Sequence, residues 1–163
     1  PDGETMIVRD AMTRDPVTCQ AGDSIADVAG VMRSRKIGGI PILEGDALVG
    51  IVTETDIIQL LMTKGPSYDL WLPSPLEIIE LPVREFINWE HTKKALTDIR
   101  QKKIADIMSK PVISITPGED IEAAAQRMLE KKIDRLCVTE NNRLVGIITR
   151  EDIVWSLAGD KEA

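Results

Sequence analysis

The stretch Val49-Gly-Ile-Val-Thr-Glu-Thr-Asp-Ile57 recurs 96 positions later as Val145-Gly-Ile-Ile-Thr-Arg-Glu-Asp-Ile153. Extended back without a gap, the same register aligns residues 22–58 with residues 118–154, and 14 of these 37 positions are identical. Chance gives about two or three matches over this length, because each common residue makes up less than a tenth of an average protein. The chain therefore contains one structural unit twice.

The correspondence continues upstream of these segments. Asp10-Ala-Met12 corresponds to Asp106-Ile-Met108, and Pro16-Val17 corresponds to Pro111-Val112 after a one-residue adjustment. We expect a short extended stretch after each of these prolines, followed by a helix.

The helix is expected to begin after Ala21-Gly-Asp-Ser24 in the first copy and after Pro117-Gly-Glu-Asp120 in the second. Their short polar side chains suit the free N–H groups of a first helical turn. Apolar residues then follow at helical spacing: Ile25, Val28, Ala29 and Met32 in one copy, and Ile121, Ala124, Ala125, Met128 and Leu129 in the other. We interpret these methionines as core residues rather than as part of a cofactor site.

A hairpin and a second helix complete each copy. The hairpin strands are predicted from pairs of short apolar runs: Ile40–Leu43 with Leu48–Val52, and Leu136–Val138 with Leu144–Ile148. Gly45, Asn141 and Asn142 suit the positive φ that a tight turn needs. Thr53 and Thr149 then begin the second helix.

The predicted unit is therefore strand, helix, strand, strand, helix. A unit of about 55 residues has too small a core to be stable alone, so the two copies are expected to bury their apolar faces against each other about a pseudo-twofold axis. We predict an α+β fold, an α/β sandwich, with repeats at residues 6–62 and 102–158 and a helical insertion at residues 63–101. Two related clefts are expected between the halves.

The insertion predicts an amphipathic linker helix from Val83 to about residue 102. The segment holds four of the five aromatic residues of the chain: Tyr68, Trp71, Phe86 and Trp89. Two interpretations stay open: the helix packs against the outside of the module, or it contacts a second chain or a partner protein, because aromatic residues are enriched in interface cores. His91, the single histidine, is interpreted as an exposed or capping residue of this helix.

The composition indicates a soluble, acidic globular chain of 163 residues, with a net charge of −7, 43% hydrophobic residues and 3% aromatic residues. The negative charge argues against nucleic-acid binding, which needs a basic face. No apolar run approaches the roughly 20 residues of a membrane span, and the start lacks the cationic part of an export signal, so no membrane association and a cytoplasmic location are expected. Cys19 and Cys137 form no metal-ligand spacing, which argues against structural zinc and a disulfide framework.

The Gly-x-x-Thr-x-x-Asp motif, present as Gly50-Thr53-Asp56 and again as Gly146-Thr149-Asp152, has two interpretations. Structurally it is close to a capping box, in which threonine and the acid three residues later satisfy N–H groups at the helix start. Functionally it places a hydroxyl, a carboxylate and a helix N-terminus at a cleft, where a carboxylate can accept both hydroxyls of a ribose and the N–H groups favour phosphate.

The duplicated constellation strongly resembles the CBS domain, named after cystathionine β-synthase. The resemblance rests on the Asp-x-Met and Pro-Val opening, the capped helix, the Gly39-Ile-Pro-Ile-Leu43 strand and the closing Gly-x-x-Thr-x-x-Asp, and it covers nearly all the chain outside the insertion. It implies a Bateman module of two repeats that commonly pairs with a second copy, so a homodimer is expected. It also implies clefts for adenosine derivatives, such as AMP, ADP, ATP or S-adenosylmethionine, and a regulatory, energy-sensing role.

Carried over by position, the family's binding mode implies two nucleotide sites. One would join Val17, Thr18, Gly39, Ile40 and Pro41 of the first repeat to Thr149, Arg150 and Asp152 of the second. The other would join Val112, Ile113, Arg135, Leu136 and Cys137 of the second repeat to Thr53 and Asp56 of the first.

The two sites differ in their expected charge. Glu54 stands where the other repeat has Arg150, and Cys137 stands where the other has Pro41, so we rank the Asp152 site above the Asp56 site. Lys36 and Lys132 are candidate phosphate contacts, with exposure to solvent as the favoured interpretation.

Two other classes of function stay open. The module is purely structural or dimerising, with the motif serving only as helix caps, or it is a piece of an enzyme or transporter. We expect no enzymatic activity, because no nucleophile–base pattern and no phosphate-binding glycine loop is present. No metal and no cofactor is expected beyond the adenosyl ligand.

Overall fold

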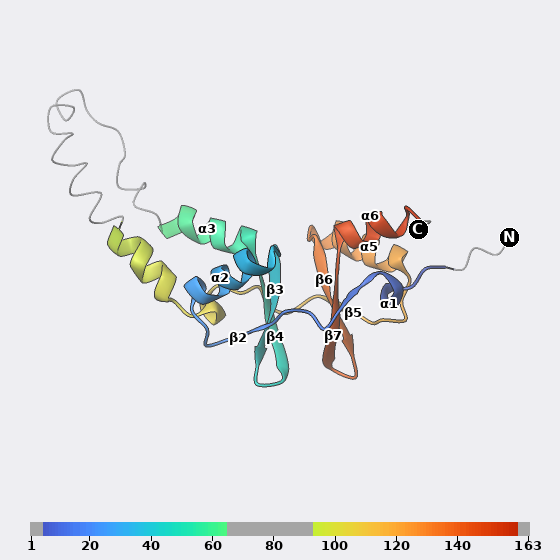
Figure 1. Cartoon of the computed structure of the whole chain (residues 1–163), viewed down its shortest axis with the longest axis horizontal. Coiled ribbons are helices and arrows are strands. Elements are labelled where there is room, and N and C mark those ends of the chain that lie inside the picture. Colours follow the sequence, from blue (N-terminus) through green and yellow to red (C-terminus); the bar gives the residue numbers. More distant parts are fainter. Residues whose placement is uncertain (1–4, 65–92, 160–163) are drawn as a thin grey trace, which may run out of the picture.

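The computed structural model describes residues 5–64 and 93–159. The first repeat consists of β2 (Cys19–Gln20), α2 (Ile25–Arg35), β3 (Gly39–Glu44), β4 (Ala47–Thr53) and α3 (Glu54–Lys64). The second consists of β5 (Ser114–Ile115), α5 (Ile121–Lys131), β6 (Arg135–Glu140), β7 (Arg143–Thr149) and α6 (Arg150–Ser156). The two halves stand side by side with their hairpins pointing the same way and their helices gathered at the other end (Figure 1). The predicted α+β fold with two repeats of the same element order is confirmed.

The apolar stripe of each first helix forms a core with its own sheet. Val28 and Met32 of α2 pack with Ile40, while Ala124 and Met128 of α5 occupy the same place in the second half. Both methionines are buried, as predicted. The cores therefore lie between the helices and one face of each sheet.

The two helices begin differently. The Ser24 hydroxyl accepts a hydrogen bond from the Asp27 N–H at 3.1 Å, whereas Asp120 makes no such cap. In the second half the Glu119 carboxylate accepts the Thr116 N–H at 2.8 Å and a bond from the Arg127 guanidinium at 2.9 Å. These bonds, the backbone one most of all, lower the pKa of Glu119.

Both hairpins have the predicted turn residues. Gly45 has φ +62°, and Asn141 and Asn142 have φ +52° and +62°. In each hairpin the second strand is antiparallel to the first, and the short strand β2 or β5 adds in parallel on the other side of β3 or β6. The asparagine and glycine positions thus close turns that few other residues tolerate.

The opening segment of each repeat packs on the opposite half. The helix α1 (Val8–Ala11) lies beside the second half (Figure 1), and β1 (Thr13–Arg14) pairs antiparallel with β7. The turn η3 (Ile104–Asp106) lies at the first half. Val8 is fully buried in the core of the second half, and Ile104, 96 positions later, is fully buried in the core of the first. Each hydrophobic core is therefore built from residues of both repeats.

The exchanged segments also explain the glycine of the repeated motif. A Cβ at Gly146 would lie 2.6 Å from the Met12 sulfur, and a Cβ at Gly50 would meet the side chain of Met108. The Asp-x-Met of each repeat thus packs on the glycine of the other.

Of the insertion, the structure describes residues 93–101, which are helical as predicted. Ile99 is buried in the core of the first half, so this part of the helix packs against the module. The remaining predictions for the insertion, including those for His91 and the four aromatic residues, lie outside the described residues. Within residues 5–64 and 93–159, no helix has the length and apolar character that a membrane span requires.

Candidate functional site: a cavity between the repeats

A cavity of about 790 Å³ lies between the two halves, next to the helix starts. Its walls come from both repeats: β4 and α3 of the first, and residues 109–113, α5, β6 and α6 of the second. The volume falls in the range of about 300–1,000 Å³ typical of small-molecule sites. Four residues of the second predicted site, Thr53, Asp56, Ile113 and Arg135, line this cavity together.

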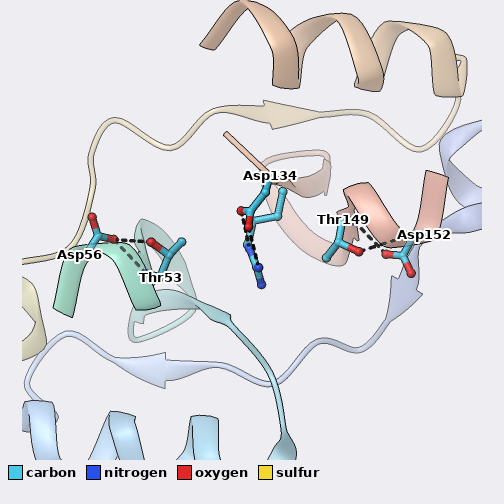
Figure 2. A network of polar contacts seen from close by, with 6 residues as sticks. Thr53, Asp56, Asp134, Thr149 and Asp152 are labelled. Carbon is cyan, nitrogen blue, oxygen red and sulfur yellow. Dashed lines mark hydrogen bonds and ion pairs between the residues drawn. The ribbon is translucent and has the colours of Figure 1, made fainter. Parts of the chain in front are cut away.

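The Asp56 carboxylate is held at the start of α3 by two groups. Its Oδ2 accepts the Thr53 N–H at 2.9 Å and the Thr53 hydroxyl at 3.3 Å, and Figure 2 shows this pair at the first helix turn. Its Oδ1 accepts the hydroxyl of Ser109 at 3.1 Å. Ser109 reaches this position because its backbone pairs with Ile51 of β4. Sequence reasoning missed Ser109, and its position one residue after the Asp-x-Met motif is the signal that points to it.

The Thr149–Asp152 pair repeats the arrangement at the start of α6 (Figure 2). The Asp152 carboxylate accepts the Thr149 N–H at 2.9 Å, and the Thr149 hydroxyl accepts the Asp152 N–H at 3.2 Å. This is a complete capping box. The structural interpretation of the motif is confirmed here, and the half-buried Asp56 and Asp152 carboxylates have a role in folding whether or not they bind a ligand.

Arg135 lies at the boundary of the two halves, in contact with Gly38 and Gly39 of the first. Its guanidinium binds both carboxylate oxygens of Asp134, at 3.0 and 3.2 Å, which lowers the pKa of Asp134. The Arg135 side chain is only 14% exposed. Its stem lies over Gly39 of the first half, where a Cβ would be 2.7 Å from the Arg135 Cδ. Glycine at position 39 therefore makes room for the arginine of the other repeat.

Arg150 also lines this cavity. Its N–H donates to the carbonyl oxygen of Asp134 at 2.9 Å, which holds the start of α6 beside β6. The family's pattern assigns Arg150 to the site of Asp152, whereas the structure places it on the wall shared with Asp56. Lys132, Arg135 and Arg150 face Asp56 and Asp134 there, so the lining carries one net positive charge in a chain whose net charge is −7.

The remaining residues of the second predicted site are placed differently. The Leu136 and Cys137 side chains of β6 are fully buried and are not among the lining residues, so they lie in the interior and not at the cavity surface. Burial raises the pKa of the Cys137 thiol to about 12. Val112 is half-buried and follows Pro111, which lines the cavity.

The residues of the first predicted site lie in several different places. Ile40 and Pro41 are fully buried, and Gly39 is buried under Arg135. Val17 is half-buried. Thr18 lines a smaller hollow of about 410 Å³ beside the hairpin ends. The site's Thr149 and Asp152 form the α6 cap, and Arg150 lines the larger cavity.

The family model of the CBS domain matches this chain twice, at residues 8–63 and 104–159. The chain belongs to the CBS-domain family. Over 158 residues it is 35% identical to the uncharacterized protein MJ1426 of Methanocaldococcus jannaschii, an alignment that covers 96% of this chain and 94% of that protein. It is also 26% identical to inosine-5'-monophosphate dehydrogenase of the same organism, over 89% of this chain but only 22% of the enzyme. CBS relatives thus include separate proteins and parts of enzymes.

Solved CBS structures share the fold. The CBS-domain containing protein ATU1752 of Agrobacterium tumefaciens superposes with a TM-score of 0.72 at 22% identity, covering 96% of this chain and 97% of that one. The CBS domain pair of protein MJ0100 superposes with a TM-score of 0.67 at 25% identity, covering 93% and 99%. That pair was solved in complex with 5'-methylthioadenosine and S-adenosyl-L-methionine.

Proposed function

We propose that this CBS pair is a regulatory module that binds an adenosine derivative in the cavity between its repeats. The ligand class comprises AMP, ADP, ATP and S-adenosylmethionine. The observation that carries the proposal is the cavity itself, which has walls from both repeats and the Asp56 carboxylate in its lining. The adenosyl ligands of the MJ0100 pair support the class.

The Asp56 carboxylate is suited to a ribose. Its Oδ1 is bonded to the exposed Ser109 hydroxyl, and a ribose hydroxyl can replace that donor at little cost, because one neutral donor is exchanged for another. Its Oδ2 remains bonded to Thr53 and keeps the carboxylate in place. The ribose therefore binds to a group that the fold already orients.

A ligand in this position contacts both halves. It favours the relative arrangement of the repeats in which both walls reach it, and the size of the response is limited by the difference in its affinity for the two arrangements. The module acts as a regulator and not as an enzyme in this proposal. Its readout is a second chain or a partner protein.

A homodimer is part of the proposal. The helices α3 and α6 and the residue that follows α6 carry large apolar side chains that are exposed in the single chain: Ile58, Leu61, Met62, Val154, Trp155 and Leu157. An exposed apolar surface of this kind is typical of a protein–protein interface. A second copy that covers it lies next to the cavity, because Val154 belongs to the cavity lining as well.

Thermal unfolding tests the proposal. A ligand at a hundred times its dissociation constant stabilises the folded state by about 2.7 kcal/mol, and a chain of this size gains about 2–4 °C per kcal/mol. The melting temperature is therefore expected to rise by about 5–10 °C with at least one of AMP, ADP, ATP, NADH or S-adenosylmethionine. No rise with any of them rejects the proposal in favour of the second candidate, a purely structural and dimerising module, which the capping role of both Thr–Asp pairs favours.

A further inference from the structure

We infer that the cavity at Asp56 selects a phosphorylated adenosine ligand and that the equivalent region at Asp152 does not, so that each chain binds one such ligand. The inference deepens the proposed function and rests on it. It reverses the order in which the sequence ranks the two sites. Two observations lead to it: the charges of the lining and the course of the Arg135 side chain.

The first observation is a charge difference between equivalent positions. The cations of the Asp56 cavity are Lys132, Arg135 and Arg150. The residues 96 positions earlier are Lys36, Gly39 and Glu54. The lysine is therefore kept, Arg135 corresponds to a glycine, and Arg150 corresponds to an acid.

The charged residues on the two sides sum to opposite net charges. The Asp56 cavity also holds Asp56 and Asp134, giving a net charge of +1. The equivalent positions on the other side carry Arg33, Lys36, Glu54, Glu151 and Asp152, giving −1. A phosphate group is anionic and is favoured in the first environment and disfavoured in the second.

The second observation is the course of the Arg135 side chain. Its stem lies on Gly39, a residue that the family's pattern assigns to the Asp152 site. Its Nη2 lies 3.1 Å from the point where a Cβ would stand on Gly38, and the carboxyl carbon of Glu54 lies 3.5 Å from the same point. The same arginine therefore adds positive charge to one site and covers part of the other.

Arg135 also has a guanidinium that the fold holds in a fixed position. Its guanidinium is bonded to the Asp134 carboxylate through two nitrogens and is largely shielded from water. The Nε and Nη2 atoms are bonded to Asp134, which leaves Nη1 to donate to a phosphate, and such a charge-assisted bond is stronger than a neutral one. A neutral nucleoside lacks this interaction, and the cationic sulfonium of S-adenosylmethionine is disfavoured by a lining whose net charge is +1.

Isothermal titration of the full chain with AMP, adenosine and S-adenosylmethionine tests the inference. We expect one AMP per chain and an affinity for AMP at least ten times that for adenosine or S-adenosylmethionine. A matched pair of variants locates the site: Lys132 and Lys36 are both exposed and both end a helix in the left-handed region, at φ +56° and +55°. Lys132→Gln is expected to weaken AMP binding several-fold and to leave adenosine binding unchanged, whereas Lys36→Gln changes neither.

Three results overturn the inference while the proposed function survives. These are two AMP molecules per chain, adenosine or S-adenosylmethionine binding as tightly as AMP, and a loss of AMP affinity in Lys36→Gln equal to that in Lys132→Gln. A chain that binds none of the three ligands, and neither ADP nor ATP, rejects the proposed function and the inference together.

Discussion

Replacing Gly146 by alanine tests whether the exchanged segments hold the two halves together. The new Cβ would lie 2.6 Å from the Met12 sulfur and 2.9 Å from the carbonyl oxygen of Thr13. Real Cβ contacts do not reach these distances, so the β1 segment has to move away from β7. Overpacking of this kind costs about 1–3 kcal/mol, which corresponds to a melting temperature lower by about 2–12 °C for a chain of this size.

Gly50→Ala is the matched control in the other half. The three atoms closest to its new Cβ all belong to the side chain of Met108, whereas a backbone oxygen stands among those at Gly146. Shortening Met108 to alanine therefore removes the two closest contacts at Gly50 and leaves only the Met108 Cβ at 3.2 Å, whereas shortening Met12 leaves the Thr13 oxygen 2.9 Å from the new Cβ at Gly146.

Thermal unfolding of the single and double alanine variants measures this difference as a coupling free energy. Gly50→Ala combined with Met108→Ala is expected to be more stable than the sum of the two single effects predicts. Gly146→Ala combined with Met12→Ala is expected to recover less, because the Thr13 oxygen stays in place. Unchanged stability of Gly146→Ala refutes the packing of the β1 segment on β7, and equal recovery in both pairs refutes the contribution of the Thr13 oxygen.

Three further predictions concern charge and burial. Asp56→Ala and Asp152→Ala each remove a carboxylate at a helix start, and each should lower the free energy of unfolding by a similar amount, about 0.5–1 kcal/mol. In thermal unfolding, only Asp56→Ala is expected to abolish stabilisation by AMP. Loss of that stabilisation in Asp152→Ala alone contradicts the site assignment. Glu119→Gln should lower the melting temperature at pH 7. This difference from the unchanged chain should vanish as the pH falls below the ordinary glutamate pKa of 4.5 and through the lowered pKa of the folded state. A difference that is the same at pH 3 argues against the ion pair. Cys19 and Cys137 are buried, and burial raises the pKa of both thiols. A thiol-reactive disulfide reagent at pH 8 should therefore label neither cysteine until the chain unfolds. Rapid labelling of the native protein disproves their burial.

The fold could be predicted from the sequence because its signals are local and occur twice. The apolar spacing before Met32 and Met128 and the turn residues Gly45 and Asn141 act within a few positions of the chain. The exchange of the opening segments could not be predicted, because Val8 and Ile104 satisfy the same pattern whichever core they enter. Only the three-dimensional packing distinguishes the two arrangements.

The candidate site could be predicted in part for a related reason. Thr53 and Asp56 are tied to a helix start, so their position follows from the local sequence. Arg150 and Glu54 also follow such starts, but the cavity that Arg150 lines depends on how the halves face each other. The sequence ranking of the sites used the family's pattern for these two residues, and it placed the positive charge on the side of Asp152.

The pairing of β1 with β7 joins Thr13 to Ile147, residues separated by most of the chain. Such a contact forms late, because the entropy of closing so long a loop has to be overcome first. During synthesis the first half acquires Ile104 only after the whole insertion has been made, and Val8 has no core to enter until the second half exists. The core of the first half can therefore be completed once Ile104 has been made, whereas Val8 stays outside any core until the second half follows. Because each half holds a segment of the other, the two are expected to unfold as one cooperative unit.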